Sequence, residues 1–290
     1  MFKIAIQNPK FYLKIINISI FKKFFVLKLT SINELEGKDF IDCVSKVLVP
    51  GKVWMTTQKN RFAEIDDITI NLLKNNSENY IHDVAVSVGI TTLDLFDKLE
   101  RNNIDYKLFV SEKYSDFLAT GKYICKVYSA DNEFIEGYFL GLVAQNNPSW
   151  ALFLSKLLFK VMYFLKDGSY RKRITIFDKR LQDLIKTEEI TIIKYDVLSS
   201  IIKEKFSYIR CMNLLNLCYF NDEQLYLAVT LLMESLKENG ILQIGRTEIV
   251  TGTNHVSFFK KENNKLRIVK EVNGGTEIMK IIKKLCIEHS

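Results

Sequence analysis

The chain has 290 residues, of which 48% are hydrophobic and 26% are charged, and its mean hydropathy is close to zero. Such a chain can bury a sizeable core, and its 12 glycines and 3 prolines argue against long disordered linkers. The net charge of +7 is spread over short clusters, so nucleic acid is not expected as a partner.

Cysteine usage and the basic N-terminus both favour the cytoplasm. The five cysteines are odd in number and include no Cys-x-x-Cys pair, so we expect neither a disulfide framework nor a metal site. Lysines interrupt every apolar run between Lys3 and Lys28, which fits neither a secretory signal nor a membrane span. Contact of this segment with a membrane surface is the less favoured alternative.

The first 78 residues are predicted to form a helical N-terminal region. Apolar residues have helical spacing over 32–76, with a break at Pro50–Gly51. From residue 79 the pattern changes to short apolar runs that alternate with helical stretches. We expect strands over 81–86, 106–110, 190–195, 208–212 and 241–244, and helices over 91–101 and 222–238. This alternation predicts one α/β domain over 79–290, with a parallel sheet covered by helices on both faces.

Residues 123–168 fit this alternation less well and are expected to be an insertion. Residues 123–144 read as a β-hairpin that turns at Asp131–Asn132, and 148–165 read as a strongly apolar helix. Such a helix must be covered, and we expect it to line an acceptor site or the interface of a homodimer. Contact with a membrane surface is again the minority alternative.

The segment from Asp83 to Gly89 is the most informative part of the chain for ligand binding. It closes the first expected strand of the sheet and opens a helix, and Ala85, Ser87 and Gly89 place small residues at alternate positions. Small residues let a ligand approach the backbone, and the helix N-terminus supplies partial positive charge and N–H groups. An ordinary strand-to-helix turn is the alternative.

This segment resembles the first motif of class I S-adenosylmethionine-dependent methyltransferases, an acidic residue followed by three small residues at alternate positions. The resemblance implies a Rossmann-like fold and S-adenosylmethionine as cofactor, contacted by Asp83, Ala85, Ser87 and Gly89. It also implies that an acid after the second strand, here Glu112, accepts hydrogen bonds from the ribose hydroxyls. For Glu112 the alternative is a solvated glutamate at a helix start.

Two later positions extend the resemblance. Asp196 follows the third strand, where the family often has an acid that binds the adenine amino group; an N-cap is the equally weighted alternative. The stretch 210–220 and the Gly245–Glu248 strand end resemble the chemotaxis-receptor methyltransferase branch, which implies that Asn213 lies beside the donor. Because 123–168 is not typical of that branch, its receptor substrate is not carried over. The resemblance covers roughly residues 80–260.

A catalytic base is the least defined part of this reading. His255 is expected on a loop after the fifth strand and is the better candidate, while His82 lies on a buried strand and reads as structural. Methyl transfer from a sulfonium donor can proceed largely by alignment. We expect methyl transfer to an oxygen or nitrogen of an acceptor, most simply a small molecule. The alternatives are a non-catalytic binding protein on a degenerate methyltransferase fold and, less favoured, an NAD-dependent oxidoreductase.

Overall fold

The computed structural model describes residues 25–28, 48–49, 53–54, 57–74, 76, 78–113, 115–120, 124–129, 134–139, 142–145, 171–248 and 250–286. The chain forms two compact units, one of residues 1–57 with 114–179 and one of residues 58–113 with 180–290. We call them the inserted unit and the sheet unit. Among the described residues, no helix is long and apolar enough to cross a membrane.

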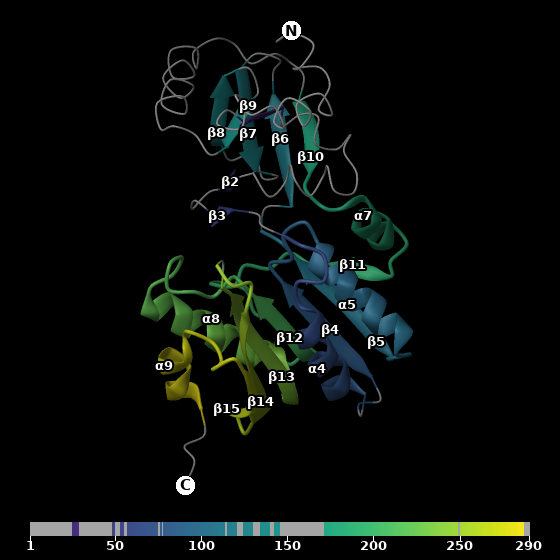
Figure 1. Ribbon diagram of the computed structural model, residues 1–290, viewed down its shortest axis with the longest axis vertical. Coiled ribbons are helices and arrows are strands. Elements are labelled where there is room, and N and C mark those ends of the chain that lie inside the picture. Colours follow the sequence, from purple (N-terminus) through teal and green to yellow (C-terminus); the bar gives the residue numbers. More distant parts are fainter. Residues whose placement is uncertain are drawn as a thin grey trace. The chain divides into compact units, whose positions relative to one another are not determined.

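The sheet unit contains a seven-stranded sheet (Figure 1). In spatial order its strands are β11 (Ile190–Ile192), β5 (Tyr106–Ser111), β4 (Asn79–Val84), β12 (Phe206–Met212), β13 (Leu236–Thr247), β14 (Asn254–Glu262) and β15 (Lys265–Val272). The first five are parallel, and β14 runs antiparallel to both of its neighbours. In chain order the parallel strands read 3-2-1-4-5, which is the Rossmann order. The expected α/β Rossmann-like sheet is therefore confirmed.

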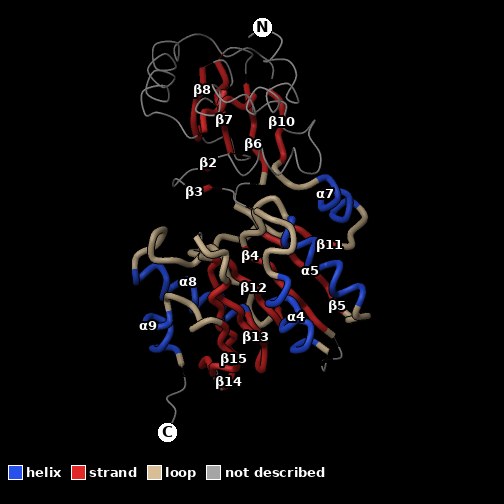
Figure 2. Tube along the Cα trace, in the orientation of Figure 1, coloured by secondary structure: helices blue, strands red, loops and turns tan. Residues whose placement is uncertain are grey.

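Helices cover both faces of this sheet, as Figure 2 shows. They are α4 (Ala63–Leu73), α5 (Ile90–Arg101), α7 (Lys179–Lys186), α8 (Asp222–Ser235), α9 (Met279–Ile282) and the 3-10 turn η2 (Lys283–Leu285). Successive side chains of a strand point to opposite faces. Accordingly, Ile209 and Cys211 of β12 pack in one cluster with α8, while Met212 packs in another with Phe62 and Ile65 at the start of α4.

Helix α8 begins and ends at positions with clear local causes. Asn221 and Gln224 form a reciprocal capping box at its start. The helix ends at Ser235 and β13 follows at once, so the expected helix end at Glu238 is wrong. Leu236 pairs with Phe206 of β12, and the next pair is Ile241 with Tyr208, so the register shifts between these two pairs.

Two further features differ from the expected organisation. Helix α4 belongs to the sheet unit because it packs on the sheet and beside α5, so the boundary of this unit lies near residue 58 and not at 78. Strands β14 and β15 were not among the expected elements. They form an antiparallel extension of the sheet beyond β13.

In the inserted unit, the described residues before α7 lie in strands or short connections. A four-stranded antiparallel sheet has the order β10 (Arg171–Thr175), β6 (Asp116–Thr120), β7 (Ile124–Ser129) and β8 (Phe134–Phe139). The pairing of β7 with β8 confirms the expected hairpin. The apolar helix expected over 148–165 lies outside the described residues.

The N-terminal part of the chain contributes strands to the inserted unit. Strand β1 (Phe25–Lys28) pairs with β9 (Leu142–Gln145), and β2 (Leu48–Val49) pairs with β3 (Val53–Trp54). Helical spacing was expected over 32–76 with a break at Pro50–Gly51, and it is wrong for 48–49 and 53–54, which are paired strands.

Candidate ligand site at the carboxyl edge of the sheet

The strand order of the sheet reverses between β4 and β12. From β4 the chain crosses to β5 on one side, and from β12 it crosses to β13 on the other. Ligands of open α/β sheets bind at this reversal point. The loops at this edge begin at Ala85, Glu112, Ile193 and Asn213. The predicted site residues Asp83, Ala85, Ser87, Gly89, Glu112, Asp196 and Asn213 all belong to these loops or to the strand ends beside them.

The loop Ala85–Gly89 has an unusual backbone that explains its sequence pattern. Ala85, Ser87 and Gly89 have φ angles of 56°, 55° and 88°, whereas Val86 and Val88 between them have negative φ. Only glycine adopts the left-handed region without strain. The small residues are therefore at the positions where the backbone needs them.

Glu112 lies against this loop. Its carboxylate accepts a hydrogen bond from the Ser87 N–H at 2.7 Å. The Ser87 hydroxyl is buried and has no hydrogen-bond partner among the described residues. Two of the predicted residues, from the ends of β4 and β5, are thus in direct contact at the reversal point.

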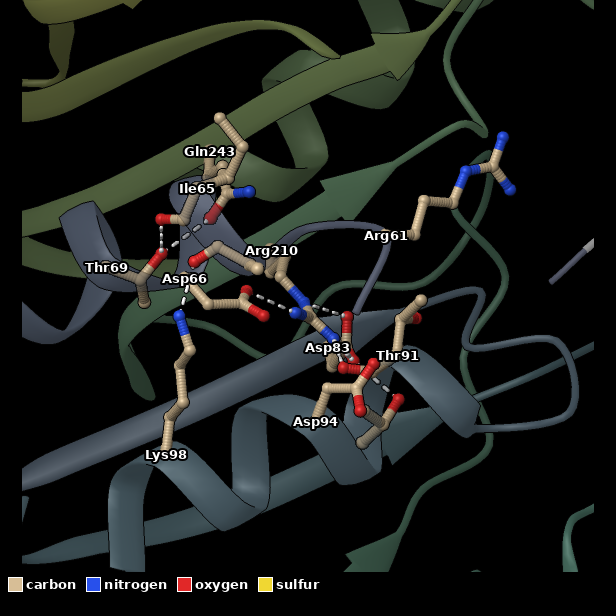
Figure 3. A network of polar contacts seen from close by, with 12 residues as sticks. Arg61, Ile65, Asp66, Thr69, Asp83, Thr91, Asp94, Lys98, Arg210 and Gln243 are labelled. Carbon is tan, nitrogen blue, oxygen red and sulfur yellow. Dashed lines mark hydrogen bonds and ion pairs between the residues drawn. The ribbon is translucent and has the colours of Figure 1, made fainter. Parts of the chain in front are cut away.

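Asp83 is placed beneath the loop rather than facing an open space. It is buried, and its two carboxylate oxygens accept from Arg210 Nε at 2.9 Å and Arg210 Nη2 at 2.6 Å. The hydroxyl of Thr92 donates to the same carboxylate at 2.7 Å. The Arg210 guanidinium also contacts Asp66 of α4 (Figure 3). In the sequence, Arg210 is distinguished only as part of the 210–220 stretch, and its contacts are visible only in three dimensions.

Gly89 is enclosed by packing on the side where a side chain would project. It is the N-cap of α5, and an added Cβ would lie 2.1 Å from Cδ2 of Leu181 in α7. Leu181 is itself fully buried. The glycine is therefore required both by its backbone conformation and by contact between α5 and α7.

Asp196 is engaged by a neighbouring lysine and by its own loop. Lys113, which follows Glu112, lies 2.8 Å from the Asp196 carboxylate, and the Leu198 N–H donates to the other oxygen at 3.0 Å. Burial acts to raise the pKa of Asp196, but these hydrogen bonds prevail and lower it. The ion pair spans the ends of β5 and β11 and is partly exposed to solvent.

Asn213 joins a group of polar residues that the sequence did not reveal. Its backbone is left-handed, and its side-chain oxygen accepts from the Thr247 N–H at 2.7 Å. The Thr247 hydroxyl donates to Asn254 at 2.7 Å and accepts from Arg61 Nε at 3.1 Å. The Asn254 amide donates to the Arg61 carbonyl at 2.8 Å. Thr247 lies within the Gly245–Glu248 strand end, and the resemblance of that segment was the only sequence feature that pointed to this polar group.

The histidines differ in their surroundings. His82 is fully buried, contacts the Ser111 hydroxyl at 2.8 Å, and burial lowers its pKa to about 3. It is therefore neutral and structural at neutral pH. His255 was expected on a loop, but it lies in β14, where it pairs with Arg246. Its Nδ1 contacts the Asn273 carbonyl. The described residues contain no cluster of His, Cys, Asp or Glu that could hold a metal ion.

No protein-family model and no curated protein matches this chain. Several solved structures do. A Methanococcus maripaludis protein described as a candidate S-adenosyl-L-methionine-dependent methyltransferase is 14% identical, with 71% of this chain and 60% of that one covered and a TM-score of 0.35. The CMeT domain of the citrinin polyketide synthase is 13% identical, with 78% and 48% covered and a TM-score of 0.39. The cyclase SpnF is 10% identical, with 77% and 55% covered and a TM-score of 0.35. At these levels of likeness, the fold is assigned from the chain's own strand order.

Proposed function

We propose that this protein is an S-adenosylmethionine-dependent methyltransferase that binds its donor at the carboxyl ends of β4, β5, β11 and β12. One observation carries the proposal. The loop Ala85–Gly89, with its three left-handed positions, lies at the reversal point of a Rossmann sheet, and the Glu112 carboxylate contacts it from the next strand. A carboxylate at this point can accept hydrogen bonds from two ribose hydroxyls.

The roles of the remaining residues follow from their positions. In this proposal Asp196 accepts a hydrogen bond from the adenine amino group, which replaces Lys113 as a partner of the carboxylate. Asp83 acts through Arg210 and the loop, because its oxygens are already used. Asn213 and Thr247 lie at the side of the proposed site next to β13. The methyl group is transferred to an oxygen or nitrogen of an acceptor, for which a small molecule is the simplest proposal.

The inserted unit is the proposed source of acceptor specificity. Its second segment leaves the sheet unit directly after Lys113 and returns at α7, so it interrupts the chain next to the proposed ribose-binding residue. Residues that hold a donor belong to the conserved architecture of a fold, whereas specificity comes from parts added to it.

Calorimetric titration with S-adenosylhomocysteine tests the donor site. Substitution Glu112→Gln should weaken binding roughly ten- to hundredfold, because hydrogen bonds to a charged acceptor contribute about 1.5–3 kcal/mol. Glu78→Gln is the matched control, since Glu78 is an exposed glutamate just before β4, at the opposite edge of the sheet. If both variants bind like the wild type, or if the wild type does not bind, the donor site is not where we propose.

A second candidate is a protein that binds the donor without turnover. It is favoured by the engagement of Asp83 and Asn213 within the protein, which leaves fewer described side chains for chemistry. Tight binding of both S-adenosylmethionine and its demethylated product, with no transfer of a labelled methyl group to any acceptor in a cell extract, would support this second function.

A further inference from the structure

Arg210 makes a set of contacts that the proposed donor site does not by itself explain. It is a fully buried arginine at the centre of the sheet, on β12, and its register partner on β4 is Asp83. Nε and Nη2 bind the two oxygens of Asp83, Nη1 binds Asp66 at 2.9 Å, and Nη2 also donates to the Thr91 carbonyl at 3.0 Å. A bidentate pair of this kind fixes orientation as well as distance.

These contacts hold both ends of the loop Ala85–Gly89. Asp83 lies just before the loop, at the end of β4, and Thr91 lies just after it, in the first turn of α5. The Thr92 hydroxyl of α5 links the same two ends of the loop by donating to Asp83. The loop is therefore clamped between two points that share one guanidinium group, as Figure 3 shows for Asp83 and Thr91.

The loop needs such a clamp because two of its residues are strained. Ala85 and Ser87 are left-handed, which costs a residue with a Cβ roughly 1–2 kcal/mol. Strained backbone persists only where the surroundings determine it, and it is concentrated at functional sites. Glycine at these positions would carry no such cost, so with alanine and serine the neighbouring structure must impose the shape.

We propose that Arg210 is a positioning residue that holds the loop Ala85–Gly89 in its ligand-binding shape by tying Asp83 to Thr91. The inference concerns the loop of the proposed donor site and rests on the proposed function only for its effect on donor affinity. Its effect on the loop itself is measurable without any ligand.

The test uses hydrogen exchange of the loop amides in the full chain. The N–H groups of Val86, Ser87 and Gly89 are hydrogen-bonded to Ser111, Glu112 and Val86, respectively. We expect Arg210→Lys to raise their exchange rates at least about tenfold relative to amides of α8. Arg210→Lys removes a buried guanidinium group and can unfold the protein. Thr92→Val is therefore the milder second variant, because it keeps the side-chain volume and loses only the hydrogen bond from the Thr92 hydroxyl to Asp83.

Substitution Ser87→Gly provides the decisive second measurement. Glycine adopts the left-handed conformation without strain, so it should return most of the lost protection in the Thr92→Val background. Asn264→Gly is the matched control, because Asn264 is also left-handed but lies in the turn between β14 and β15. Unchanged exchange in Thr92→Val, or equal rescue by both glycines, would overturn the proposal.

Affinity for S-adenosylhomocysteine separates this inference from the proposed function. If the wild type binds it, Thr92→Val should bind more weakly and Ser87→Gly should restore binding. If the wild type does not bind it, the proposed function fails, while the exchange data still decide whether Arg210 holds the loop.

Discussion

Asp66 accepts a hydrogen bond from Arg210 through one carboxylate oxygen, and its other oxygen is buried with no partner among the described residues. Burial raises the pKa of Asp66 to about 6, although Arg210 and Lys98 act against this shift. Helix α4 is thus anchored to the sheet by a carboxylate whose negative charge is disfavoured by burial.

Replacing Asp66 by Asn should change how stability depends on pH. The folded pKa lies above the unfolded value of 3.8, so the native state binds more protons between these values. The contribution of Asp66 to stability is full below about pH 4 and is lost as pH rises through about 6. Relative to the wild type, Asp66→Asn should therefore gain on the order of 1–3 kcal/mol between pH 4 and 7.

Urea unfolding of both proteins across this range measures that difference. A constant offset from the buried amide is expected at all pH values and does not affect the slope. Asp67→Asn, on the exposed side of the same helix, is the control. A wild-type-to-variant difference independent of pH would show that Asp66 is charged throughout.

Glycine at the two strained loop positions should stabilise the protein. In Ala85→Gly and Ser87→Gly the left-handed strain is removed, and in the second case a buried hydroxyl without a partner is removed too. We expect each variant to gain up to about 1 kcal/mol in the free energy of unfolding. Ala228→Gly in α8 should lose about 1 kcal/mol or more in the same denaturation experiment. Losses at all three positions would contradict the described loop geometry.

Gly89→Ala should destabilise the fold. The new Cβ meets Leu181 and requires a φ of +88°, which together should cost roughly 2–5 kcal/mol. Gly252→Ala isolates the backbone part, because Gly252 is also left-handed but has open space around it. Calorimetric melting that shows equal losses for both variants would mean that contact with Leu181 is relieved at little cost.

Lys113→Met should leave the free energy of unfolding within about 1 kcal/mol of the wild type, because the Lys113–Asp196 pair is partly exposed. If Asp196 binds the adenine amino group, losing the lysine removes a competitor and affinity for S-adenosylhomocysteine should rise a few-fold. Parallel denaturation and titration measure the two effects separately. Weaker binding with unchanged stability would indicate that Lys113 itself contacts the ligand.

The elements that flank the candidate site could be predicted from local sequence pattern. The buried strand before Asp83, the helix after Gly89 and the acid at residue 112 are each visible in a short window of sequence. The small residues at alternate positions were expected only to let a ligand approach the backbone, and the structure shows in addition that all three have left-handed backbone.

The long-range contacts were beyond such reasoning. Arg210 is 127 positions from Asp83 and 144 from Asp66, and nothing in an apolar strand pattern says which residues an embedded arginine will meet. The link of Thr247 to Arg61 and Asn254 has the same origin. The extension by β14 and β15 was missed because these strands follow the last recognised motif, and no motif marks their alternation of apolar and polar residues.

The pairing of β1 with β9 joins Phe25 to Gln145, and this separation has a consequence for biosynthesis. A ribosome adds roughly 5–20 residues per second, so the first strand of the nascent chain must wait about 6–24 s for its partner. During that interval the chain emerging behind it includes β4, α5 and β5, which in turn wait for β12. The segments of the two units thus alternate along the sequence. Synthesis of the sheet unit begins before the inserted unit is complete and ends only after it.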